Sequence, residues 1–278
     1  MTDDVLIRLA KNRADFEACV PVQRAVWQTS DLEVTSALQM IATSHAGGLV
    51  QLAERDGRIV GFANAFPALR GGIPHLHSDM LAVLPEEQGH GVGEKLKWAQ
   101  RAEALARGVT LITWTYDPLQ AQNANLNLRR LAAVAPEFQA DFYGITTSSL
   151  HHGLPTDRLI VHWNLNSPRV RERASQGPLP RTAPPPSFPR INDVKWQAGW
   201  PVSSDPRMDL TDEALLLEIP PDWNVLCQAA PRVAELWHGK VRAAFSAYLS
   251  KAKGYVAADF VPAEEGGRRR PLYVLRKA

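Results

Sequence analysis

The feature that most constrains the fold is the glycine-rich segment Gln88–Gly93, which reads Gln-Gly-His-Gly-Val-Gly. Residues 76–84 before it are apolar and strand-like, and residues 92–107 after it have helical periodicity. A glycine-rich turn between a strand and a helix exposes backbone N–H groups at the positive end of the helix dipole. The segment therefore predicts an anion cradle, of the kind that usually holds phosphate.

Two familiar phosphate-binding patterns do not match this segment fully. A Walker loop requires Gly-Lys-Ser/Thr at its end, and Lys95 here is followed by Leu96. A dinucleotide fingerprint requires G-x-G-x-x-G, whereas these glycines fall at G-x-G-x-G. Because Asp117 ends the next predicted strand, where a ribose-binding acid could lie, a nicotinamide-dependent oxidoreductase stays open. A glycine-rich turn without any ligand stays open as well.

A third pattern, Gln/Arg-x-x-Gly-x-Gly/Ala, is matched in full by Gln88, Gly91 and Gly93. In this the segment resembles the pyrophosphate loop of the GNAT superfamily of N-acyltransferases. The resemblance implies that an acyl-coenzyme A binds here, with acetyl-CoA as the default co-substrate. Its pyrophosphate would contact the backbone of Gly89, His90, Gly91, Val92, Gly93 and Glu94. Gln88 adds a neutral donor where many family members carry arginine.

The order of the predicted elements agrees with this resemblance. Residues 1–166 read as β-α-α-β-β-β-α-β-α-β-β, which is the order of the GNAT fold, so we expect an α/β (α+β) mixed sheet flanked by helices. The chain as a whole resembles a longer branch of predicted acyltransferases with an extra C-terminal region. The segments 81–85, 112–120 and 127–131 carry this second resemblance.

A proline-rich stretch divides the chain. Prolines stand at 178, 180, 184, 185, 186 and 189, which excludes a helix interior or a central strand there. We therefore predict a GNAT-like acyl-CoA-binding catalytic domain over residues 1–166 and a linker over 167–190. Residues 191–278 are predicted to form a small β-α-β-β region. Because its predicted helix 231–249 has a broad apolar face, we expect it to pack on the first domain, near strand 158–165, or on a dimer partner.

Composition argues against a nucleic-acid-binding, membrane or secreted protein. A net charge of +2 over 278 residues gives no case for a nucleic-acid partner. No apolar run approaches the roughly 18–20 residues that a membrane helix needs. Two distant cysteines, Cys19 and Cys227, are no disulfide framework and suit a reducing cytoplasm. The acidic start Met1-Thr-Asp-Asp does not read as a signal or transit peptide. We expect a cytoplasmic protein with neither a membrane nor a nucleic-acid partner.

Candidate catalytic groups precede the loop. His75, His77 and Asp79 alternate along one predicted strand and so point to one face. A carboxylate or imidazole there, Asp79 or His77, could take the proton from an ammonium substrate. The alternative is that these polar residues only solvate the start of the strand. His-x-His-x-Asp lacks a nearby fourth ligand, so no metal is expected. The resemblance also implies that the backbone of Leu81, Ala82 and Val83 pairs with the pantetheine arm.

The general acid of the resembled family is missing. The family motif is an asparagine followed by small and apolar residues and a tyrosine that protonates the leaving thiolate. Aligned on this motif, the chain has Leu128 where the tyrosine would be. Asn123 or Asn125 could still bond the pantetheine amides. Tyr143 is the nearest replacement acid in sequence and Tyr116 is another, although either could simply be a core or rim aromatic.

Taken together, these patterns predict an acyl-CoA-dependent N-acyltransferase that acts on a small-molecule amine such as an amino acid. The amine would attack the thioester directly, without a covalent enzyme intermediate. Acetyl is the default acyl group and succinyl the alternative, and the linker also allows a homodimer. A non-catalytic coenzyme-binding or regulatory module stays open because the tyrosine is missing.

Overall fold

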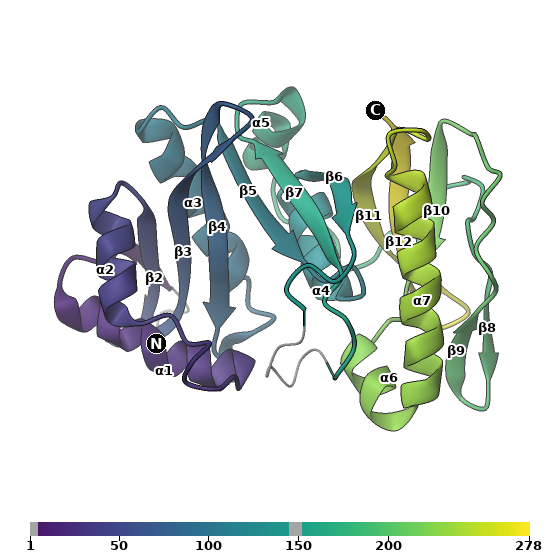
Figure 1. Ribbon diagram of the computed structural model, residues 1–278, viewed down its shortest axis with the longest axis horizontal. Coiled ribbons are helices and arrows are strands. Elements are labelled where there is room, and N and C mark those ends of the chain that lie inside the picture. The colour runs from purple at the N-terminus through teal and green to yellow at the C-terminus, as the bar shows by residue number, and fades with distance from the viewer. Residues whose placement is uncertain (1–4, 145–151) are drawn as a thin grey trace. The chain divides into compact units, whose positions relative to one another are not determined.

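The computed structural model describes residues 5–144 and 152–278 and divides into two compact units (Figure 1). Of the described residues, the first unit holds 5–114 and 163–174, and the second holds 115–144, 152–162 and 175–278. The boundary passes through two strands, β5 and β7. No described helix is both long and apolar enough to cross a membrane.

The first unit contains the glycine-rich segment. Its elements are β1 (Leu6–Leu9), α1 (Arg13–Trp27), α2 (Ala37–His45), β2 (Leu49–Arg55), β3 (Arg58–Arg70), β4 (Ile73–Val83), the 3-10 turn η1 (Pro85–Glu87), α3 (Val92–Ala106), the start of β5 (Leu111–Tyr116) and α5 (Pro168–Ser175). The sheet order is β1-β2-β3-β4-β5, with antiparallel pairs up to β4 and a parallel pair between β4 and β5. A parallel pair needs a crossover connection, which α3 supplies.

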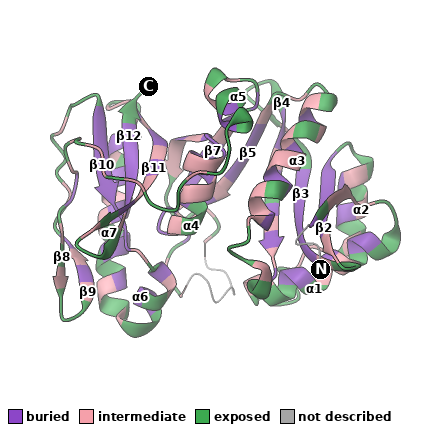
Figure 2. Cartoon of the chain, turned by 180° about the vertical axis from the view of Figure 1, so that it is seen from behind, coloured by how far each residue is buried: buried purple, intermediate pink, exposed green. Residues whose placement is uncertain are grey.

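Turn residues and helix faces explain this order. Asp56 and Gly57, with φ of 49° and 77°, close the β2–β3 hairpin that the Asp-Gly pair predicts. Helices α1 and α2 pack on one face of the sheet and α3 on the other (Figures 1 and 2). The strands between them are buried (Figure 2), with Phe62 on β3 and Leu96 on α3 fully enclosed.

The second unit is built around an antiparallel sheet of order β7-β6-β11-β12-β10. Helix α7 carries a buried face that includes Trp237, whose Nε1 donates to the Pro201 carbonyl at 2.8 Å. The elements are α4 (Ala121–Ala124), the π-helix η2 (Asn125–Arg130), β6 (Val134–Gln139), β7 (Arg158–Asn164), the hairpin β8 (Val194–Gln197) and β9 (Trp200–Ser203), β10 (Ala214–Glu218), α6 (Trp223–Ala229), α7 (Pro231–Tyr248), β11 (Tyr255–Glu265) and β12 (Arg268–Lys277).

The mixed α/β fold predicted from the sequence is confirmed, and the structure also holds elements that were not anticipated. Helix α5 lies within the stretch predicted as linker, and α6 and the β8–β9 hairpin lie in the C-terminal region. The last helix in the predicted order of residues 1–166 is α-helical over only four residues, after which a π-helix begins. The domain boundary at residue 166 stays a prediction, since compactness does not test independent folding.

The C-terminal region packs within its own unit. Strand β11 pairs with β6 through Ala257 and Ala135, and Arg242 of α7 donates to Asp157, directly before the 158–165 strand near which we expected contact. The hydroxyl of Tyr273 on β12 also donates to the Pro118 carbonyl at 2.8 Å. Whether a dimer partner contacts this region stays a prediction.

Two glycines with different surroundings give a matched test of this packing. A Cβ on Gly61 of β3 would lie 2.7 Å from the carbonyl oxygen of Ala82 on β4, so Gly61→Ala must displace backbone. A Cβ on the exposed Gly239 of α7 would meet nothing within 4 Å. We expect Gly61→Ala to lower the free energy of unfolding by about 1–3 kcal/mol. Gly239→Ala should raise it by about 0.4–1 kcal/mol. Urea unfolding of both variants measures this, and equal effects would contradict the described β3–β4 contact.

Candidate active site

The glycine-rich segment forms the turn between β4 and α3. Gly89 and Gly91 have φ of +81° and +79°, in the left-handed region that favours glycine. A Cβ added to either would meet nothing within 4 Å, so open space adjoins both. These glycines are therefore required by the backbone path of the turn and not by close packing.

Helix α3 begins at this turn without a side-chain cap. Gly91 is its N-cap residue, and the first helical hydrogen bond runs from Lys95 N to Gly91 O at 3.0 Å. The N–H groups of Val92 and Gly93 come before it and so have no partner within the helix. Val92 itself is 1% exposed and fixes the start of the helix in the core. Backbone donors at the positive end of a 15-residue helix are suited to an anion.

Side chains of the loop have varied roles. Gln88 Nε2 donates to the Val83 carbonyl at 2.9 Å, which fastens the loop to the end of β4. The side chain of His90 is exposed. Glu94 Oε1 accepts a hydrogen bond from Trp98 Nε1 at 3.4 Å, one turn later on α3. The anion-binding potential of the segment therefore lies mainly in its backbone.

Strand β4 leaves its parallel partner before it reaches the loop. Its pairs with β5 are Leu76–Ile112 and His77–Thr113, and β4 continues to Val83. The departure coincides with a bulge, because two residues of β4, Ser78 and Asp79, oppose the single Ala65 of β3. Leu81, Ala82 and Val83 lie beyond this point and pair with β3 on their other side. An extended ligand could therefore use the backbone of β4 here.

His77 and Asp79 lie beside this departure point. His77 Nδ1 is 2.9 Å from Thr113 Oγ1, and its ring centroid is 5.2 Å from that of Phe66. Burial lowers the pKa of His77 to about 4, with smaller contributions from His75 and Lys97, so its imidazole is neutral at pH 7. His75 is buried and bonds the Ile73 carbonyl through Nδ1 at 3.0 Å.

Asp79 is exposed to solvent. The protein around it nevertheless raises the pKa of its carboxyl above the ordinary value, because it removes part of the carboxylate's hydration. Ser78, between His77 and Asp79, faces α3, where its Oγ accepts a hydrogen bond from Lys97 Nζ at 2.9 Å. Within the described residues, no group of three or more His, Cys, Asp or Glu side chains could hold a metal ion.

The other predicted site residues belong to the second unit. Tyr143 is half-exposed, and its hydroxyl lies 3.2 Å from Thr115 Oγ1. Asn123 is exposed on α4, whereas Asn125 begins the π-helix with its Oδ1 buried and without a hydrogen-bond partner. Leu128 is fully buried in the π-helix.

Comparison with known proteins bears directly on this arrangement. The model of the "Acetyltransferase (GNAT) family" matches residues 13–132, which span α1 to the end of the π-helix and include the glycine-rich loop. Residues 13–132 are an acetyltransferase domain of the GNAT family. The match supports an acetyltransferase enzyme.

Solved structures similar to this chain carry related names. The ribosomal-protein-S18-alanine N-acetyltransferase of Escherichia coli is 16% identical, with a TM-score of 0.47 over 59% of this chain and 96% of that one. The yncA protein of Salmonella typhimurium, solved with its cofactor acetyl-CoA, is 19% identical, with a TM-score of 0.48 over 59% and 95%. The ribosomal-protein-alanine N-acetyltransferase of Brucella melitensis is 22% identical, with a TM-score of 0.47 over 56% and 98%. The family assignment rests on the family model, since these TM-scores are below 0.5. No curated protein sequence matches the chain.

The sheet of the GNAT domain also explains why the dinucleotide pattern fails. A dinucleotide fold needs a doubly wound parallel sheet, whereas β1 to β4 are antiparallel. Asp117 follows β5 and accepts a hydrogen bond from the Leu119 N–H at 2.8 Å, so one of its oxygens closes a turn.

The partly buried position of His77 in the GNAT domain predicts a pH dependence of stability. Its pKa is about 4 in the folded protein, against 6.5 for an unperturbed histidine, so the unfolded chain binds more protons between these values. The free energy of unfolding should therefore fall as pH drops from 6.5 to 4, by at most about 1.4 kcal/mol per pH unit from this group. Urea unfolding of wild type and His77→Gln from about pH 4.5 to about pH 7.5 should show a smaller fall in the variant. His90→Gln, at an exposed position, is the control, and equal pH slopes in all three would refute the assignment.

Proposed function

We propose that this protein is an acetyl-CoA-dependent N-acetyltransferase that acetylates the amine of a small molecule such as an amino acid. The observation that carries the proposal is the uncapped, glycine-rich N-terminus of α3, directly after a strand that has left its parallel partner. The family supports the acetyl group and the coenzyme. Succinyl transfer is the alternative, because the residues described do not select the acyl chain.

The residues present fit coenzyme A. The backbone of the 89–94 loop would hold the pyrophosphate at the helix N-terminus. The 81–83 segment of β4 would pair with the pantetheine amides, and the buried Oδ1 of Asn125 would accept from one of them. A buried oxygen without a donor is costly, so a ligand N–H would stabilise Asn125.

The chemistry requires two proton transfers. The bound thioester supplies the acetyl group, which the amine takes by direct attack as the C–S bond breaks. Asp79 accepts the proton of the acceptor ammonium, directly or through water, and its raised pKa makes it a better base than an ordinary aspartate. His77 stays neutral beside it and orients the acceptor. Tyr143 donates a proton to the departing sulfur, in place of the hydroxyl that Leu128 cannot supply.

Cys19 and Cys227 support both direct transfer and a cytoplasmic location. Both are free and buried. Burial raises the pKa of each thiol to about 12, so each stays a thiol at neutral pH and is a poor nucleophile. Two unpaired thiols agree with a reducing compartment.

A charge placed in the loop tests coenzyme binding. Asn and Asp have similar size and both tolerate a positive φ, so Gly91→Asn and Gly91→Asp differ mainly in charge. Calorimetry with acetyl-CoA and succinyl-CoA should show at least about tenfold weaker binding by Gly91→Asp than by Gly91→Asn, near 1.4 kcal/mol. The same affinity in both folded variants would exclude the loop as the pyrophosphate site.

Removing the carboxylate of Asp79 tests the base. Asp79→Asn should lower kcat by about 10²-fold or more and leave the affinity for acetyl-CoA within about twofold. Steady-state kinetics with a panel of amino acids measures this. Asp56→Asn, in the β2–β3 turn, is the matched control and should behave like wild type. Wild-type turnover by Asp79→Asn would remove Asp79 from the mechanism.

A further inference from the structure

The turn that carries Tyr143 is held by one short segment of the chain. The N–H groups of Phe142 and Tyr143 donate to the carbonyl and the Oγ1 of Thr156, at 2.8 and 2.9 Å. Thr156 Oγ1 in turn donates to the Gly144 carbonyl at 3.1 Å, and the N–H of Asp141 donates to Asp157 Oδ1 at 3.0 Å. The position of Tyr143 therefore depends on Thr156 and Asp157.

Asp157 is in turn held by helix α7. Arg242 donates to both carboxylate oxygens, from Nε to Oδ2 at 2.9 Å and from Nη2 to Oδ1 at 2.5 Å. Oδ1 thus joins the Arg242 guanidinium directly to the N–H of Asp141. The Asp157 side chain is only 4% exposed, so Arg242 balances a charge that water does not reach.

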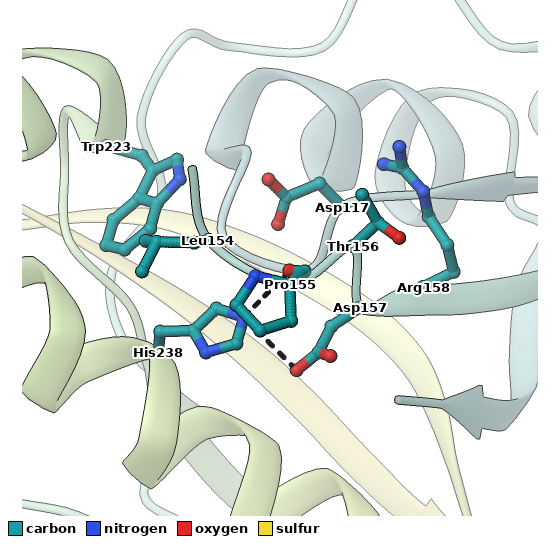
Figure 3. A pocket seen from close by; sticks show the side chains of 8 residues that line it. All are labelled: Asp117, Leu154, Pro155, Thr156, Asp157, Arg158, Trp223 and His238. Atoms are coloured by element: carbon teal, nitrogen blue, oxygen red, sulfur yellow. Dashed lines mark hydrogen bonds and ion pairs between the residues drawn. The ribbon is translucent and has the colours of Figure 1, made fainter. Parts of the chain in front are cut away.

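A second contact from α7 reaches the same segment. His238 Nε2 lies 3.1 Å from the Pro155 carbonyl and 3.4 Å from Asp157 Oδ2 (Figure 3). The adjoining cavity has a volume of about 10 Å³, which is room for about one water molecule and too small for a substrate. These contacts therefore connect α7 to the 155–157 segment and do not form a binding pocket.

Arg158, the next residue along the chain, reaches Tyr143 from the other side. Its guanidinium carbon lies 5.2 Å from the centroid of the Tyr143 ring, within the range of a cation–π contact. A shift of Asp157 would therefore move both the backbone of the Tyr143 turn and the cation over its ring.

We propose that Arg242 is a positioning residue that fixes the hydroxyl of Tyr143 through Asp157. The inference rests on the proposed function, in which Tyr143 is the acid. It gives the C-terminal region a part in the reaction without contact to either substrate.

The first test measures the turn itself, without substrate. In full-length protein, Arg242→Ala should raise amide hydrogen exchange at residues 141–143 at least about tenfold, because all three N–H groups bond to Thr156 or Asp157. Lys240→Ala is the control on the same helix, since Lys240 Nζ bonds the Ser203 carbonyl instead. It should leave exchange at 141–143 unchanged. Equal exchange at 141–143 in wild type and Arg242→Ala would overturn the proposal.

The second test links the turn to turnover. Arg242→Ala should lower kcat at least about tenfold with KM for both substrates within about twofold. Arg242→Lys, which keeps the charge but not the two-pronged geometry, should recover part of this loss. In a Tyr143→Phe background the Arg242→Ala change should cost less than about twofold, because two residues that act through one group are not additive. Additive losses of kcat in the double variant would overturn the proposal. If Arg242→Ala does not fold, Arg242→Lys is measured in the wild-type and Tyr143→Phe backgrounds instead.

If Tyr143 is not the general acid, the kinetics give a different result. Wild-type kcat in Tyr143→Phe would overturn both the assignment of Tyr143 as acid and the positioning role derived from it. Coenzyme binding at the Gly91 loop would be untouched by that outcome.

Discussion

The departure of β4 from β5 after the His77–Thr113 pair is the constraint on which the candidate site depends. Had the two strands stayed paired as far as Val83, the backbone of β4 would be satisfied on both sides and closed to a ligand. The bulge at Ser78 and Asp79 marks the place of departure. Burial alternates along β4 through this place, so that Asp79 lies at the surface while Ser78 meets a buried lysine of α3. Where β4 leaves β5, it thus presents a backbone edge with a carboxylate beside it.

The loop and the fold could be predicted from the sequence because their signals are local. Glycines at 89, 91 and 93, an apolar strand before them and a helical period after them all lie within about 30 residues of chain. The Asp56-Gly57 hairpin has the same character. Such patterns depend on the conformational preferences of the residues themselves, and tertiary contacts do not override them here.

The remaining parts of the site depend on contacts that sequence spacing does not encode. The motif around Asn125 was aligned by residue order alone, which does not reveal that a π-helix forms there. In a π-helix, side chains five apart take the place of those four apart. The contact of Arg242 with Asp157 joins residues 85 positions apart, and no local pattern marks either of them. Gln88 is a similar case. The motif predicts that its side chain donates to the ligand, whereas in the structure it donates to the Val83 carbonyl.

The pairing of β6 with β11 covers a strand edge within a single chain. The hairpins β6–β7 and β11–β12 meet through their first strands, which run antiparallel, as two copies of one hairpin would across a two-fold axis. Without residues 191–278 the β6 edge would be open, and an unpaired strand edge can pair with a second molecule. Fusing the covering hairpin to the same chain raises its effective concentration and removes the dependence on protein concentration. Dilution therefore leaves this edge covered.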